Sequence, residues 1–198
     1  ALGISNVSFD HQLRLPARSQ GNSNGTMWAM LGLGGESWGD LTVGGTIISI
    51  PHGFPGRNAL NLQYTPPVHV GPVKFGVGMQ DVTGNAGSSG EALENKIGRG
   101  HSNSAFAVAT ADLGNGVFLS AGTGTQRFRR SFVNGSASVT DRFKVFLEHD
   151  GFNFNYGVAT ELGPLLGGES EDANRGSVVM MLGLVRSRYL GWSVNLTF

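Results

Sequence analysis

The chain has no cysteine, few charges and no long apolar run. Charged residues make up 14% of its 198 positions, well below the roughly 25% of an average soluble domain. Lys plus Arg and Asp plus Glu are 14 each, so the basic excess of a nucleic-acid-binding protein is missing. Without cysteine there is no disulfide framework and no thiolate metal site. The longest apolar stretches, such as SVVMMLGLV, fall far short of the roughly 20 residues of a transmembrane helix.

Helical periodicity is nearly absent as well, and only residues 91–96 favour a helical turn or two. Apolar and polar residues alternate instead, between clusters of Gly, Pro and Asn, which is typical of β-strands. No helix is available for a parallel crossover, so we expect antiparallel pairing in a single domain over residues 1–198. The alternation predicts ten strands, at 2–15, 26–34, 40–50, 58–65, 68–82, 103–113, 116–129, 138–149, 152–162 and 176–198.

The last stretch of the chain, RYLGWSVNLTF, is the most regular of these segments. Its large apolar residues occupy every second position, at Leu190, Trp192, Val194, Leu196 and Phe198. The same parity continues back through Leu184 to Val178 without a slip, and a two-residue hairpin would reverse it. We therefore expect 176–198 to form one long strand.

The composition of the two faces indicates which one meets the core. One face carries mostly Gly, Ser, Thr and Asn with isolated charges, which suits a crowded, hydrogen-bonded interior. The other face is aliphatic and aromatic on strand after strand, as in Phe143, Val145 and Leu147, and it suits lipid. A sheet in a bilayer has to close, because every backbone polar group must pair internally. The pattern therefore predicts a closed transmembrane barrel, with a soluble lipocalin-like barrel as the alternative.

These features resemble the small bacterial outer-membrane β-barrels, from the OmpA/OmpX type to the ten-stranded omptins. The resemblance implies an outer-membrane location, an even strand number of about ten (or eight) and periplasmic termini. It implies that Leu190, Trp192, Val194, Leu196 and Phe198 are read by the outer-membrane assembly machinery. It also implies that the long connections, chiefly 83–102 and 162–175, are extracellular.

Several charged residues fall on the face predicted to be internal, and buried charges have to be paired. The predicted lumen charge network is Asp10, Arg14, Lys74, Arg142, Lys144, Glu148 and Glu161. A barrel of eight to ten strands leaves little room beyond its side chains. We therefore expect a filled lumen and a structural or surface-interaction role through the loops. A narrow channel for ions or small solutes is the alternative, and an outer-membrane hydrolase is a third hypothesis.

Other candidate sites rest on weaker patterns. Four arginines are predicted at the outer membrane interface, where they would meet lipopolysaccharide phosphates: Arg127, Arg129, Arg186 and Arg188. The acidic residues Glu169, Glu171 and Asp172 could hold Ca²⁺, although their spacing is not that of an EF-hand loop. The five histidines are scattered without a metal-ligand or catalytic spacing, so no catalytic set and no further cofactor is predicted.

Overall fold

The computed structural model describes residues 2–14, 24–48, 58–84, 103–164, 177–185, 187 and 189–197. Among these residues, no helix has the length and hydropathy that a membrane span requires. The elements are β1 (Leu2–Arg14), β2 (Asn24–Gly35), β3 (Gly39–Ile48), β4 (Asn58–Thr65), β5 (His69–Val70), β6 (Val73–Gln80), β7 (Ser104–Asp112), β8 (Val117–Gly124), the short 3-10 helix η2 (Gln126–Phe128), β9 (Phe132–Thr140), β10 (Phe143–His149), β11 (Phe154–Pro164), β12 (Ser177–Val185) and β13 (Tyr189–Thr197).

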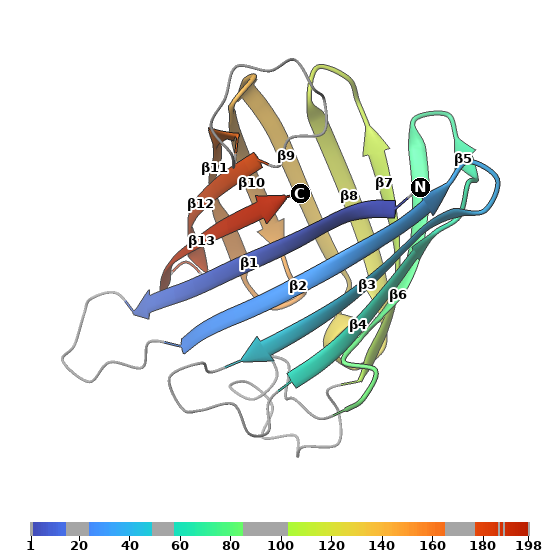
Figure 1. Cartoon of the computed structure of the whole chain (residues 1–198), viewed down its shortest axis with the longest axis horizontal. Coiled ribbons are helices and arrows are strands. Elements are labelled where there is room, and N and C mark those ends of the chain that lie inside the picture. The colour runs from blue at the N-terminus through green and yellow to red at the C-terminus, as the bar shows by residue number, and fades with distance from the viewer. Residues whose placement is uncertain are drawn as a thin grey trace.

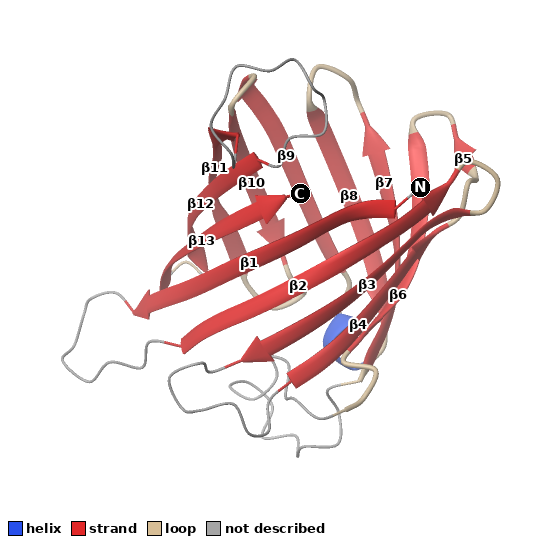
Figure 2. Ribbon diagram, viewed as in Figure 1, coloured by secondary structure: helices blue, strands red, loops and turns tan. Residues whose placement is uncertain are grey.

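The strands form one closed antiparallel barrel (Figures 1 and 2). Apart from β4 and β5, strands that follow one another along the chain pair with each other. Strand β1 pairs with β13 over nine residues of each strand. A pairing between β4 and β6 completes the ring. Of the 13 strands, β5 has only two residues and pairs with β6 alone, so the ring is made by the other twelve. The expected closed, antiparallel, up-and-down barrel is confirmed, but the expected number of ten strands, or eight, is too low.

The first missing strand is β9, which lies between the expected strands 116–129 and 138–149. Strand β8 ends at Gly124, and β9 runs through the small residues of NGSAS. The expected strand 138–149 contains the two-residue turn 141–142 that joins β9 to β10. Small residues on both faces of β9 give almost no contrast in hydropathy, so its period of two is weak in the sequence.

The second missing strand comes from a turn that keeps the parity of the apolar residues. The expected strand 176–198 is two strands, β12 and β13, paired from Val185 with Tyr189 to Ser177 with Thr197. Three residues, 186–188, separate them, and Ser187 has a φ of 51°. Because this loop has an odd length, Leu182 pairs with Trp192 and Leu184 with Leu190. All four therefore share one face, and the pattern runs through the turn unchanged.

The extra turns change which connections lie at which end of the barrel. Asn6, near the start of β1, pairs with Thr197 at the end of β13, so both ends of the described chain lie at the same end of the barrel. The strand order puts the connection 165–176 at this end too, although 162–175 was expected at the opposite end. The connections 15–23, 49–57, 81–103 and 150–153 lie at the opposite end.

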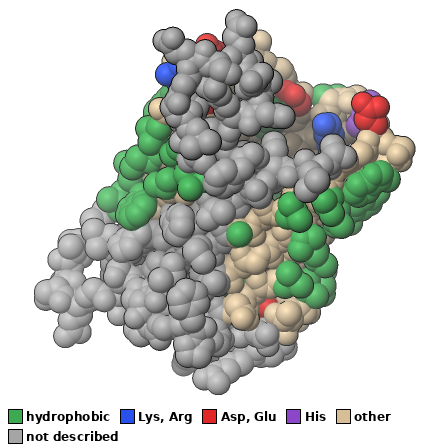
Figure 3. Space-filling model, in the orientation of Figure 1, with side chains coloured by type: hydrophobic (Ala, Val, Ile, Leu, Met, Phe, Trp, Pro, Cys, Tyr) green, Lys and Arg blue, Asp and Glu red, His purple; other side chains and the backbone are tan. Residues whose placement is uncertain are grey.

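The outer surface of the barrel is apolar over wide areas (Figure 3). Val145, Leu147 and Phe154 are 37%, 52% and 55% exposed, and they alternate with Lys144 and Glu148 along the paired strands β10 and β11. This is the arrangement of a sheet that faces lipid on one side. It agrees with the face expected from the sequence.

Two turn glycines at the end with the termini provide a matched test of backbone strain. Gly39 has a φ of 90°, and a Cβ at this position would meet the carbonyl oxygen of Thr65 and the backbone of Pro66. Gly71 also has a positive φ, of 57°, but a Cβ there would meet nothing within 4 Å. We expect Gly39→Ala to lower the free energy of unfolding by roughly 1–3 kcal/mol more than Gly71→Ala. Equal unfolding midpoints in urea, measured by tryptophan fluorescence, would contradict this.

Candidate lumen site

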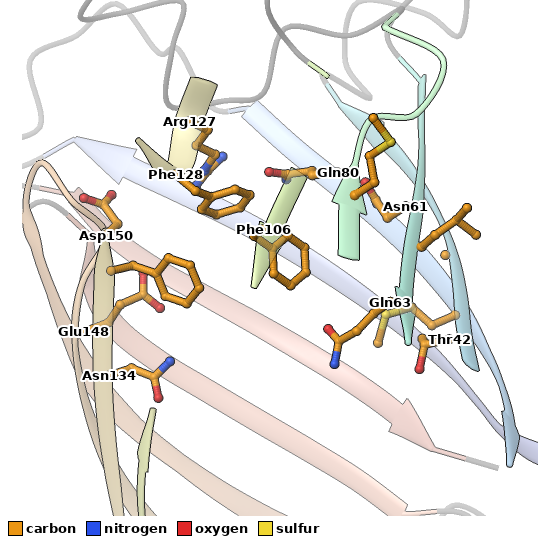
Figure 4. A pocket seen from close by; sticks show the side chains of 15 residues that line it. Thr42, Asn61, Gln63, Gln80, Phe106, Arg127, Phe128, Asn134, Glu148 and Asp150 are labelled. Atoms are coloured by element: carbon orange, nitrogen blue, oxygen red, sulfur yellow. The ribbon is translucent and has the colours of Figure 1, made fainter. Parts of the chain in front are cut away.

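A cavity of about 370 Å³ lies inside the barrel (Figure 4). Its walls come from strands on opposite sides of the ring and from η2. The polar side chains that line it are Thr42, Asn61, Gln63, Gln80, Arg127, Asn134, Glu148 and Asp150. Because successive residues of a strand point to opposite faces, these positions identify the internal face of their strands. The internal face is therefore mainly polar and the external face mainly apolar.

Three phenylalanines interrupt the polar lining. Phe106 of β7, Phe128 of η2 and Phe132 of β9 all line the cavity. The ring centroids of Phe106 and Phe128 are 5.1 Å apart, and those of Phe128 and Phe132 are 5.3 Å apart. The Phe106 and Phe132 rings are 6.4 Å apart at an interplanar angle of 77°. Phe106 makes favourable edge-to-face contacts with both other rings, and the rings of Phe128 and Phe132 are tilted against each other. The three rings therefore form one apolar cluster, which we name the Phe cluster.

Hydrogen bonds fix several of the polar side chains. The Asn155 amide donates to Oε1 of Glu148 at 3.0 Å, across the β10–β11 pair. The Asn61 amide nitrogen donates to Oγ1 of Thr46 at 2.9 Å, and Asn61 Oδ1 accepts from the Asp81 backbone N–H at 3.0 Å. These bonds hold Asn61 and Glu148 in place beside the cavity, on strands from different parts of the ring.

Arg127 is not where the sequence analysis expected it. It was predicted to lie on the outward face of a strand 116–129, with Arg129 beside it. The strand ends at Gly124, and Gln126, with a φ of 45°, starts the short helix η2. Arg127 lies on the cavity wall with its guanidinium 6.0 Å from the Phe128 ring (Figure 4). Arg129 is exposed in the turn that follows.

The predicted lumen charges do not form one cluster in the described part of the barrel. Arg142 is exposed in the turn 141–142, outside any strand, so its expected place on the inner face of a strand is wrong. Lys144 lies on the inner face of β10 with its ammonium 4.9 Å from the Phe118 ring. Lys74 and Glu161 are exposed, on β6 and β11. Of these charges, Glu148 alone lines the described cavity.

Several other predicted residues can be placed only in part. Asp10 and Arg14 are on β1, where they pair with Ser193 and Tyr189 of β13, on the same parity. The outer face of β12 continues on β13 with Leu190, Trp192, Val194 and Leu196, of which Trp192 is 41% exposed. Outside the described residues lie Arg186, Arg188, Phe198 and the acidic residues Glu169, Glu171 and Asp172. Within the described ranges, no group of three or more His, Asp or Glu side chains could hold a metal ion.

No local sequence pattern indicates the Phe cluster or the amides around it. Phe106 and Phe132 belong to different strands. Each lies on the same side of its strand as the polar residues of the internal face, and this alternation could have identified them as internal. Their proximity depends on the β7–β8 and β8–β9 pairings, which no local pattern specifies.

Comparison with known proteins supports the porin-type architecture. The KdgM porin superposes with a TM-score of 0.60 at 9% identity, over 98% of each chain. A second structure, the KdgM porin in complex with disordered oligogalacturonate, gives a TM-score of 0.58 at 10% identity over the same shares. A mutant of the Rh. blastica porin matches at a TM-score of 0.40, which is too low to carry an argument.

No family model and no curated protein sequence matches the chain. The structural matches are below 25% identity, so they bear on the fold alone. The resemblance to outer-membrane barrels is confirmed at this level, with twelve ring strands in place of ten. The chain has the closed antiparallel β-barrel fold of an outer-membrane porin.

Proposed function

We propose that the protein is a channel of a bacterial outer membrane that admits small hydrophilic solutes. The observation that carries this proposal is the closed ring of twelve strands around a cavity whose lining includes eight polar side chains. Twelve strands spaced about 4.8 Å apart and tilted by about 40° enclose a ring about 24 Å across between opposite backbones. Such a ring leaves more room for solutes than the eight- to ten-stranded barrel expected from the sequence.

The greater width favours the channel over a filled structural barrel. The expectation of a salt-bridged plug rested on a crowded lumen, and no ion pair joins Lys74, Arg142, Lys144, Glu148 and Glu161 among the described residues. The KdgM porin, in complex with disordered oligogalacturonate, is a precedent for a saccharide complex of a barrel with this fold. A role in surface interactions through the long loops remains the second candidate, because the connections 15–23, 49–57 and 81–103 all join strands at the same end of the barrel.

The orientation of the barrel is part of the proposal. We place the end with both termini and the connection 165–176 in the periplasm, and the connections 15–23, 49–57 and 81–103 outside the cell. Bacterial barrels of this type carry their longer loops on the outer side. The outward face of β13 would then serve as the signal for the assembly machinery, with Arg129, Arg186 and Arg188 near lipopolysaccharide phosphates at the outer interface.

We expect the purified protein to give discrete ion-conducting steps in planar lipid bilayers. Asn134→Trp adds a large side chain to the cavity wall and should reduce the unit conductance about twofold, since pore diameter limits conduction. Val133→Trp is the matched control, because Val133 directly precedes Asn134 in the chain and is 51% exposed on the outer face. A folded barrel that stays electrically silent, or equal losses in the two variants, would contradict the channel.

A further inference from the structure

The Phe cluster is partly exposed to the cavity, although it lies on the internal face of the barrel. All three rings are half-buried, so their mutual contacts leave part of each ring exposed. Asn134 on β9 and Glu148 on β10 point to the same internal face of the barrel as the Phe cluster. Apolar rings at these positions have no contact with lipid, and they reduce the polarity of a channel for water and ions. Their position fits a solute with an apolar face.

The backbone around the cluster is held by a set of short hydrogen bonds. The Phe128 N–H donates to the Thr125 carbonyl at 2.8 Å, and the Thr125 N–H donates to the Ala105 carbonyl at 2.9 Å. In return the Ala105 N–H donates to Oγ1 of Thr125 at 3.0 Å. The Arg127 N–H donates to Oγ of Ser104 at 3.3 Å, and Ser104 is fully buried. The first turn of η2 is thereby fixed to the start of β7, so Phe128 is pre-organised beside Phe106, which lowers the cost of binding.

Four of the eight polar side chains that line the cavity are amides. Figure 4 places Asn61, Gln63 and Gln80 on the wall opposite Glu148 and Asn134. A side-chain amide both donates and accepts hydrogen bonds, as a hydroxyl group does. Oε1 of Gln80 is buried and has no hydrogen-bond partner among the described residues, so a ligand hydroxyl that reached it would satisfy a buried acceptor. Pockets for polar ligands combine apolar walls with a few such groups.

The charges of the lining do not favour an anion. Arg127 is the one cationic residue among those that line the described cavity, and Glu148 and Asp150 are both acidic. The described lining residues therefore have a formal charge of −1, from one cation and two carboxylates. An acidic solute would meet net repulsion here, whereas a neutral hydroxylated solute would not.

We infer that this cavity is a binding site for a neutral oligosaccharide, with the Phe cluster as the stacking surface. A pyranose ring has an apolar face of C–H groups and a rim of hydroxyls. The C–H face packs on Phe128 and its neighbours, and the hydroxyls bond to the amides and to Glu148. This inference deepens the proposed channel function and rests on it, since the solute has to enter the lumen.

Calorimetric titration of the full-length, detergent-solubilised protein tests the site without requiring conduction. The probes are maltotriose, which is neutral, and trigalacturonate, which is acidic. Maltotriose should bind more tightly than trigalacturonate. Phe128→Leu keeps an apolar side chain but removes the ring, and should raise the dissociation constant for maltotriose about 2- to 12-fold. Phe118→Leu is the matched control, because Phe118 is also internal but lies under Lys144 and outside the cavity lining; it should leave the constant within twofold.

Gel mobility with and without heating confirms that each variant is folded. A conducting barrel that gives no heat with maltotriose overturns the saccharide site and leaves the channel standing. A silent barrel that binds maltotriose supports the site and overturns the channel. A lower dissociation constant for trigalacturonate than for maltotriose would contradict a neutral ligand. An equal rise in the dissociation constant for maltotriose in Phe118→Leu would contradict the role of the Phe cluster.

Discussion

Val145→Arg is expected to lower the free energy of unfolding of the lipid-embedded barrel by about 2–4 kcal/mol. Val145 is 37% exposed on the outer face of β10 and pairs with Ala137 of β9 and Val158 of β11. It lies near the middle of these three strands, so an arginine there would be placed far from either interface. The cost is that of a cation in hydrocarbon, reduced by snorkelling. Urea titration of the protein in lipid vesicles, followed by tryptophan fluorescence, measures the loss.

The control for this prediction places the same charge on the other face. Ser136 of β9 is internal, since it pairs with Phe146 on one side and Phe118 on the other. Ser136→Arg projects a flexible cation into the wet lumen and should cost less than about 1 kcal/mol. A larger loss in the free energy of unfolding for Ser136→Arg than for Val145→Arg would mean that the apolar face is the core of a soluble barrel. The difference between the variants thus tests the membrane assignment directly.

Gly78→Val is expected to open the seam that closes the ring, with a loss of about 3 kcal/mol in the free energy of unfolding. Strands β4 and β6 pair through three residue pairs only, against nine for β1 and β13. Gly78 pairs with Gln63 in the middle of this seam. A Cβ at Gly78 would lie 2.6 Å from the Leu62 carbonyl oxygen and would also meet the Phe106 ring. The ring can rotate away, but the Leu62 carbonyl belongs to the β4 backbone and has to move.

A second glycine on a strand supplies the comparison. Gly45 of β3 is exposed, and a Cβ there would meet nothing within 4 Å. Gly45→Val should change the stability by less than about 1 kcal/mol, the span of β-propensity. Heat-modifiable gel mobility and urea midpoints report on both variants. If Gly78→Val unfolds at the same urea concentration as Gly45→Val, the seam is not a weak point of the barrel.

The sequence by itself determined the class of the fold and the two faces of its sheet. The period of two in segments such as 2–15, 40–50 and 58–65 corresponds to β1, β3 and β4. The side of the sheet that carries Val145, Leu147 and Phe154 is the exposed outer face, as its composition predicted. These properties are local, because the alternation of side chains along a strand needs no information about its partners.

Only the tertiary structure decided the number of strands and the ends at which the connections lie. Strand β9 has little contrast in hydropathy, so the sequence pattern does not reveal it. The three-residue connection 186–188 leaves the alternation of apolar residues unchanged, so the pattern does not show where β12 ends and β13 begins. The cavity also depends on the tertiary structure, because the pairing of β7, β8 and β9 brings Phe106, Phe128 and Phe132 together. Which internal positions face one another is set by ring closure and register, and these are long-range properties of the whole sheet.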